Sequence, residues 1–160
     1  MIRSKKPFLL LLTLMVPIVC AAAQDKPKLE APDSQVALGC LRTINTAEAA
    51  YASTYTKGFS PNLAAMGEKA GSANPTPEAA QLIDNSLSGG RKAGYVFTYK
   101  PGPKDKSGMI AAYTVAARPV KWQEGVVSFF TDQSGVIRWT KANRAATAKD
   151  PSIDSLLDSK

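Results

Sequence analysis

The apolar residues of this chain change their spacing near Gly94. Before that position they recur at intervals of three and four residues, which is typical of amphipathic helices. After it they alternate with polar residues, which is typical of strands with one covered face. Helices that precede a run of short strands predict an α+β fold, because the apolar stripe of a helix must be buried and a sheet face can cover it. A length of 160 residues indicates one domain.

A long helix is predicted from Gln35 to Thr56. Asp33 or Ser34 can cap its start, and Gly58 can close it. The apolar face of this helix is expected to lie against the sheet; its residues are Val36, Ala37, Cys40, Leu41, Ile44, Ala47, Tyr51 and Tyr55. The opposite, polar face is expected to meet water; its residues are Gln35, Arg42, Asn45, Glu48 and Ser53.

Two short helices are predicted next, one around Leu63 and Met66 and one from Thr76 to Leu87. Four strands follow, at residues 94–99, 110–118, 126–131 and 136–140. The connections between these strands are short, and a tight turn joins the last two, so consecutive strands are expected to pair antiparallel. The predicted fold class is therefore α+β, with a long N-terminal amphipathic helix packed on a four-stranded antiparallel β-meander.

The first 23 residues have the order of a secretory signal peptide, with a basic start, an apolar middle and a small-residue end. Pro17 interrupts the apolar run, which is shorter than the roughly 20 apolar residues that a membrane span requires. Cleavage before Gln24 is therefore predicted, and the processed protein is expected in the periplasm or outside the cell, without a transmembrane span. The alternative is lipid attachment at Cys20, although Val19 stands where lipidation sites usually have a small residue.

Four parts of the chain are predicted: a signal peptide at 1–23, an exposed lead-in at 24–34, an α+β domain at 35–141 and a flexible tail at 142–160. After cleavage the chain retains Cys40 as its one cysteine, so no internal disulfide is expected. Because this residue lies on the apolar helix stripe, its thiol is predicted to be buried.

Five segments, in this order and spacing, carry a resemblance to a known family. They are LRTINTAEAAYASTY (Leu41–Tyr55), GFSPNLAAMG (Gly58–Gly67), GYVFTY (Gly94–Tyr99), AYTVAARP (Ala112–Pro119) and FFTDQSGVIR (Phe129–Arg138). Together they resemble the globular part of type IV pilin-like proteins, which include pilins and secretion-system pseudopilins. The resemblance implies a helix-then-meander fold and transfers no catalytic residues. The usual prepilin leader and polymerising apolar half helix are missing, so it implies a soluble accessory or stand-alone domain with envelope, secretion or pilus proteins as partners.

The chain contains no histidine. Ser-His-Asp catalysis, Cys-His catalysis and His-ligated metal sites all need an imidazole, so these classes are excluded for a single chain, and no cofactor or metal is expected. The alternative to a non-enzymatic protein is a hydrolase or sugar-binding protein that uses paired carboxylates. Acids scattered singly among lysines and arginines are expected to be solvated surface groups; those in this chain are Glu48, Glu68, Glu78, Asp84, Glu124 and Asp132.

Basic and aromatic residues are interleaved in the stretch from Arg118 to Arg144. Trp139 alternates with Arg138 in a predicted strand and is therefore expected to face the core. Trp122 lies in a predicted loop, where no core position is expected for it, and this makes it the best candidate for contact with a partner. The candidate contact residues are Trp122, Lys121, Arg138, Lys141 and Arg144.

Two kinds of function fit this stretch. The leading prediction is a non-enzymatic, exported domain that acts through protein contacts, as an accessory to a type IV pilus or a type II secretion apparatus. The second alternative is a DNA- or polyanion-binding module, in which cations follow the phosphates while rings stack on the bases. Because Trp139 is expected to face the core, nucleic acid is not the predicted partner.

Overall fold

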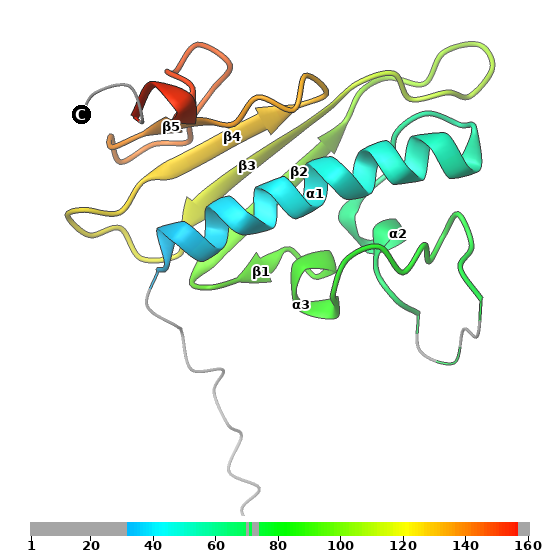
Figure 1. Cartoon of the computed structure of the whole chain (residues 1–160), viewed down its shortest axis with the longest axis horizontal. Coiled ribbons are helices and arrows are strands. Elements are labelled where there is room, and N and C mark those ends of the chain that lie inside the picture. The colour runs from blue at the N-terminus through cyan, green and yellow to red at the C-terminus, as the bar shows by residue number, and fades with distance from the viewer. Residues whose placement is uncertain (1–31, 70, 72–73, 157–160) are drawn as a thin grey trace, which may run out of the picture.

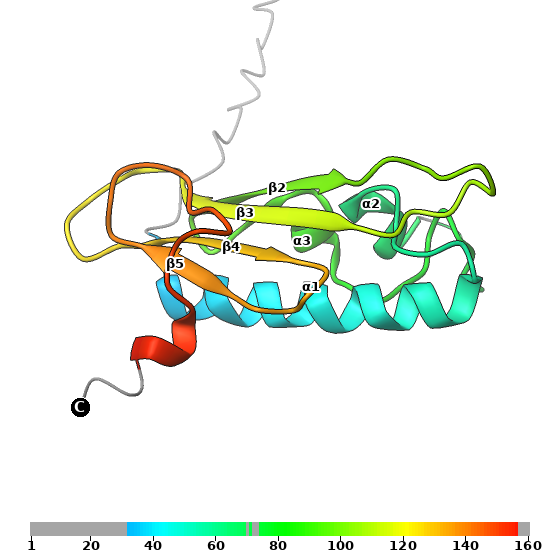
Figure 2. The same cartoon turned by 90° about the horizontal axis from the view of Figure 1, so that it is seen from above.

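The computed structural model describes residues 32–69, 71 and 74–156, so the predicted signal peptide and most of the lead-in lie outside the described residues. Its helices are α1 (Ser34–Tyr55), α2 (Leu63–Met66), α3 (Asn85–Ser88) and the 3-10 helix η1 (Ile153–Leu156). Its strands are β1 (Arg91–Lys92), β2 (Tyr95–Pro101), β3 (Tyr113–Pro119), β4 (Ser128–Asp132) and β5 (Arg138–Thr140). These strands form one antiparallel sheet in the order β1-β2-β3-β4-β5, and α1 lies across one of its faces (Figure 1, Figure 2).

The predicted fold class, a long helix packed on a four-stranded meander, is wrong, because the sheet has five strands. The additional strand is β1, in which Arg91 pairs with Val96 and Lys92 pairs with Tyr95. A strand of two residues is too short to show an alternating pattern, so hydrophobic periodicity does not reveal it. The four-stranded, pilin-like plan that the resemblance implies does not describe this chain.

The second predicted short helix, at residues 76–87, forms only near its end, as α3. The amides before α3 are bonded to the α2 region instead: Ala80 N donates to Ala65 O and Leu82 N donates to Met66 O, both at 2.8 Å. A segment whose amides are bonded to another element cannot also form the regular helical ladder. Within the described residues, α1 is therefore the one helix of more than four residues.

α1 begins at a predicted cap. The Asp33 carboxylate accepts hydrogen bonds from the backbone amides of Gln35 and Val36, both at 3.0 Å, and so satisfies two groups without helical partners. Thr56 and then Gly58 follow the last turn in left-handed backbone conformations, with φ of 54° and 76°. Val36, which was predicted on the apolar stripe, is 43% exposed. The buried residues of α1 are Ala37, Leu38, Cys40, Leu41, Ile44, Ala47, Glu48 and Tyr51.

The core between α1 and the sheet is built by alternation along the strands. Buried core residues on β2, β3 and β4 are Tyr95, Phe97, Tyr113, Val115, Ala117 and Phe129. Successive members on one strand are two residues apart, so they point to the same face. Trp139 on β5 packs against this core, as predicted. Burial of apolar surface, worth about 25 cal/mol per Å², is the main favourable contribution that holds the helix to the sheet.

Glu48 is not the solvated acid that was predicted, because its side chain is fully buried on the core side of α1. Its carboxylate accepts hydrogen bonds from Ser60 N at 2.9 Å and Ser60 Oγ at 2.6 Å. The Tyr99 hydroxyl donates to Ser60 O at 2.8 Å and extends this network to the sheet. Burial raises the pKa of the Glu48 carboxyl.

Cys40 is buried, as predicted, and its thiol is free among the residues that the structure describes. Burial raises the pKa of its thiol, which favours the neutral and less nucleophilic form. Among the residues that the structure describes, no helix has the length and apolar character needed to cross a membrane.

The predicted flexible tail packs on β5 over its described part, residues 142–156. Trp139 N donates to Pro151 O at 3.0 Å, and Ile153 N donates to Ile137 O at 2.8 Å. These backbone bonds lie just before η1 and at its first residue, so this stretch belongs to the folded unit. A composition rich in Ala, Ser, Asp and Lys does not reveal such bonds, because backbone groups of any residue can make them.

Candidate docking groove on the open sheet face

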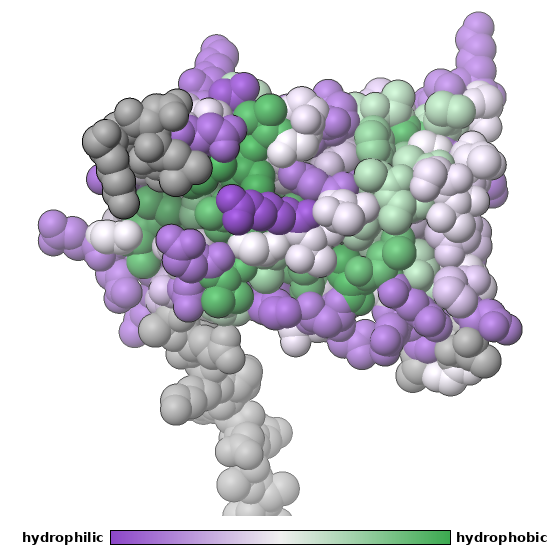
Figure 3. Space-filling view, viewed as in Figure 1, coloured by the Kyte–Doolittle hydropathy of each residue, from purple (hydrophilic) through white to green (hydrophobic). Residues whose placement is uncertain are grey.

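The face of the sheet away from α1 carries the alternate positions of β2, β3 and β4. They are Val96, Thr98, Lys100, Thr114, Ala116, Arg118 and Phe130. Figure 2 shows α1 on one side of the sheet and the loop that follows β5 arching over the other side. Figure 3 shows the α1 side, where hydrophilic and neutral residues lie over the helix between hydrophobic stretches, so the groove described next is on the far side from that view.

This open face is hollowed into a groove of about 730 Å³, a size typical of ligand pockets. Val96, Ala116 and Phe130 give it an apolar floor. Trp122, in the loop between β3 and β4, lines it, and so does the stretch 143–147 after β5, apart from Arg144. The groove therefore joins four strands and two loops that are far apart in the sequence, so the sequence does not show how close they lie.

The lining of the groove is positively charged. Arg91, Lys100 and Arg118 line it, and no Asp or Glu does. Both salt bridges in the described part of the chain involve other residues, so these three cations have no carboxylate partner there. Arg118 Nη2 donates to Asn143 Oδ1 at 3.0 Å, which leaves the charge of the guanidinium uncompensated. Such a lining attracts anions.

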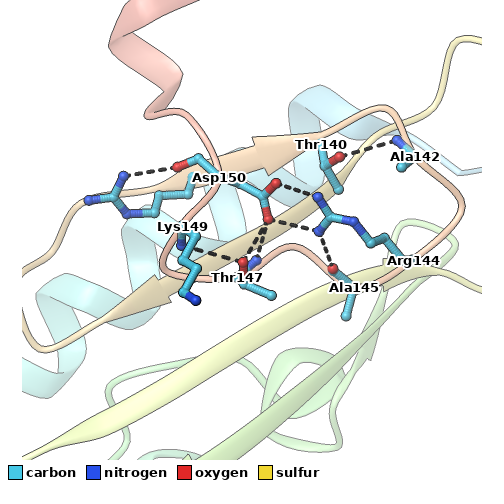
Figure 4. A network of polar contacts seen from close by, with 8 residues as sticks. Thr140, Ala142, Arg144, Ala145, Thr147, Lys149 and Asp150 are labelled. Atoms are coloured by element: carbon cyan, nitrogen blue, oxygen red, sulfur yellow. Dashed lines mark hydrogen bonds and ion pairs between the residues drawn. The ribbon is translucent and has the colours of Figure 1, made fainter.

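Asp150 fixes the wall loop, residues 142–147 (Figure 4). Its carboxylate accepts from Arg144 Nη1 at 2.8 Å and Nη2 at 2.5 Å, and from Thr147 N at 2.7 Å and Oγ1 at 2.9 Å. The Arg144 guanidinium, followed by the Thr147 donors, holds the pKa of the Asp150 carboxyl well below its ordinary value. A two-pronged pair of this kind constrains the geometry of its two side chains, so it stabilises the observed position of the wall loop over the sheet.

Two of the predicted contact residues lie at or beside the groove. Trp122 lines it and is partly exposed. Lys121 is exposed and precedes Trp122 in the same loop, but it is not part of the lining. The structure thus puts the aromatic candidate where a partner could reach it.

The other three predicted contact residues lie outside the groove. Arg138 Nη1 donates to Asp150 O at 2.9 Å, and Arg144 is the ion-pair partner of the same residue. The Lys141 ammonium lies 5.7 Å from the centroid of the Trp139 ring, within the range of a cation–π contact. The basic stretch is therefore divided between internal contacts and exposed surface, and it does not form one binding face.

Sequence reasoning did not choose Arg91, Lys100 or Arg118 as contact residues, although Arg118 begins the basic and aromatic stretch. A signal for Lys100 was available, because it stands at an alternate position to Tyr95, Phe97 and Tyr99 and so points away from the aromatic face. Arg91 had no such signal, since its strand was not predicted.

None of the six candidate acids lines the groove. Glu48 is buried beside Ser60. The Asp132 carboxylate accepts from Ser134 N at 2.9 Å and Ser134 Oγ at 2.6 Å, which is the bonding of a turn residue. The remaining four are exposed; they are Glu68, Glu78, Asp84 and Glu124.

A second hollow of about 420 Å³ lies beside the C-terminal part of α1. Lys57, Lys104 and Glu78 line it, so both signs of charge are present. The Tyr51 hydroxyl at this site already donates to Pro77 O at 2.7 Å. This hollow has less charge preference than the groove. Within the described residues, no three Cys, Asp or Glu side chains gather as metal ligands would.

The groove is thus the more selective of the two hollows for a ligand, because it combines an apolar floor with positive charges and no negative ones. Among the contact residues predicted from the sequence, Trp122 is the one that lines the groove. Comparisons of the chain with protein-family models, with curated proteins and with solved structures gave no match.

Proposed function

We propose that this protein is an exported, non-catalytic binding domain that docks an acidic segment of a partner protein in its groove. The observation that carries the proposal is the lining, in which Arg91, Lys100 and Arg118 occur without any carboxylate. An uncompensated positive surface attracts an acidic partner, speeds its approach and disfavours basic ones.

An acidic protein segment suits the groove better than nucleic acid does. Val96, Ala116 and Phe130 offer apolar surface, and Trp122 and Arg118 are of the residue types enriched at the centres of protein interfaces. Three cations would neutralise only a few phosphates, whereas the affinity of nucleic-acid-binding proteins grows with the number of phosphates that they neutralise. A phosphate backbone would also bury little apolar surface against this floor.

Export is part of this proposal. The signal-peptide pattern of residues 1–23 supports a location in the periplasm or outside the cell. The resemblance to pilin-like proteins supports a partner among envelope, secretion or pilus proteins. Neither feature supplies a catalytic residue, which is in keeping with a protein that works by contact.

The proposal is tested by panning a displayed library of random peptides against the purified protein and two variants. Arg118→Glu reverses the charge of the groove. Arg42→Glu makes the same change on the exposed side of α1, on the other face of the molecule. Both side chains are exposed, so neither substitution is expected to change stability by more than about 0.5 kcal/mol.

Wild type and Arg42→Glu are expected to select the same peptides, enriched in Asp and Glu, and Arg118→Glu is expected to lose them. A loss of about 1–3 kcal/mol, or roughly 5- to 150-fold in affinity, is typical when a charged contact becomes repulsive. Peptides that bind Arg118→Glu as well as wild type would overturn the proposal. So would a protein that retains no peptide but binds a labelled single-stranded oligonucleotide in a manner that Arg118→Glu abolishes.

A further inference from the structure

We infer that the occupant of the groove is an extended segment in which an apolar side chain stands midway between two acidic side chains that are four residues apart. This inference rests on the proposed function and specifies its ligand. It follows from the register of the strands, which fixes where the cations stand relative to the apolar floor.

The register places two arginines at one end of the groove. Arg91 pairs with Val96 across β1 and β2, and Val96 pairs with Arg118 across β2 and β3. These three residues therefore form one row across the sheet, with a cation on each side of an apolar residue. A carboxylate above Val96 is within reach of two guanidinium groups, which bind carboxylates with paired hydrogen bonds.

The next row carries no charge within the groove, and the last row has a single lysine. Thr98 pairs with Ala116, which pairs with Phe130. Arg138 pairs with Phe130 across β4 and β5, but it lies outside the lining and its guanidinium donates to Asp150 O, so the centre of the groove is without charge. Lys100 pairs with Thr114 in the row beyond it. Cations thus stand at both ends of β2, and apolar surface lies between them.

The distance between the two charged rows sets the spacing in the ligand. Val96 and Lys100 are four residues apart on β2, and a strand rises about 3.3 Å per residue, so the rows are about 13 Å apart. An extended segment parallel to β2 has the same rise, and its side chains at every second position share a face. Acids four residues apart would meet the two cationic rows, and the residue midway would meet Ala116 and Phe130. In a helix, residues four apart are separated by only about 6 Å and would not reach both rows.

The two ends of the groove are expected to differ in how strongly they attract a carboxylate. Asp132 pairs with Thr114 in the register of β3 and β4, so a carboxylate lies near the lysine row although it is bonded to Ser134. No such acid pairs with the arginine row. The acid of the ligand that meets Arg91 and Arg118 should therefore contribute more affinity than the acid that meets Lys100.

A matched pair of peptides tests the spacing. One has the core Glu-Thr-Leu-Thr-Glu and the other has the core Glu-Thr-Glu-Thr-Leu, with identical Ser and Thr flanks and a fluorescent label. The two have the same composition, charge and length, and differ in the distance between the acids. Fluorescence anisotropy is expected to show that the first binds wild type about fivefold more tightly, the effect of one exposed ion pair.

The lysine row is tested separately. Lys100→Gln is expected to abolish the preference between the two peptides, because the distant acid then has no cation. Lys106 is an exposed lysine of the β2–β3 connection and does not line the groove, so Lys106→Gln is expected to keep the preference.

Equal affinity of the two peptides for wild type, or a preference that survives in Lys100→Gln, would overturn the inference. If selected peptides still depend on Arg118 in that case, the proposed function stands and only the spacing is wrong. If neither these peptides nor any selected peptide depends on Arg118, both proposals fall together.

Discussion

At the scale of single residues, Glu48 shows how one buried acid links helix and loop. Its carboxylate is bonded to both donors of Ser60, and no cation contributes to its environment. Burial raises its pKa, so the folded state holds this proton more tightly than the unfolded state does. Its contribution to stability is therefore fully present below the unfolded pKa, about 4.3, and is lost as pH rises through the folded pKa.

Glu48→Gln is expected to remove this pH dependence. The amide keeps an acceptor for Ser60 N and cannot ionise, so wild type should lose stability relative to the variant as pH rises above about 4.3. Free energies of unfolding from urea titrations at several pH values measure the difference. Glu68→Gln, an exposed control, is expected to retain the wild-type pH slope. A constant difference between Glu48→Gln and wild type across pH would refute this account.

The burial of Glu48 could have been predicted from its position. Ile44 lies four residues before it and Tyr51 three residues after it, and both are on the apolar stripe. The prediction nevertheless placed it in water, because a glutamate is almost never fully buried without a partner. The partner, Ser60, lies 12 residues away, and helical periodicity carries no information about it.

At the scale of elements, most of the predicted helices and strands were found at the expected places. The helix expected from Gln35 to Thr56 is found at Ser34–Tyr55, within one residue at each end. The four alternating segments correspond to β2–β5. The failures, β1 and the helix expected at 76–87, have a common cause: contacts with another element decide the local structure, through pairing with β2 and through bonds to the carbonyls of α2.

The wall loop gives a prediction at this scale. Asp150→Asn keeps the shape of the side chain but removes its charge and weakens its bonds to Arg144 and Thr147. Hydrogen exchange is expected to show faster exchange of the Thr147 amide, by about tenfold, and the affinity for acidic peptides is expected to fall. Exchange in the core strands should not change.

Asp154→Asn is the control for the wall loop, since it removes an exposed carboxylate from the same C-terminal stretch. This variant is expected to behave as wild type in both measurements. If the Thr147 amide exchanges at the wild-type rate in Asp150→Asn, the ion pair does not position the loop.

At the scale of the whole molecule, the groove exists because α1 covers one sheet face and leaves the other to two loops. The position of Trp122 on accessible surface could be predicted, since a tryptophan in a loop has no core position. The grouping of Arg91, Lys100 and Arg118 could not, because it depends on β1 and on the register between strands. Arg138, Lys141 and Arg144 lie outside the groove: Asp150 accepts bonds from both arginines, and the Lys141 ammonium lies over the Trp139 ring. Their role as partner contacts stays a prediction.

The most direct test of the docking groove is a nuclear magnetic resonance titration of the labelled protein with the Glu-Thr-Leu-Thr-Glu peptide. The account predicts that the largest amide shift changes lie at residues 96–100 and 114–118, with further changes in the wall loop, while the amides of α1 keep their positions. Changes concentrated on α1 or around the second hollow, or no change at saturating peptide, would contradict it.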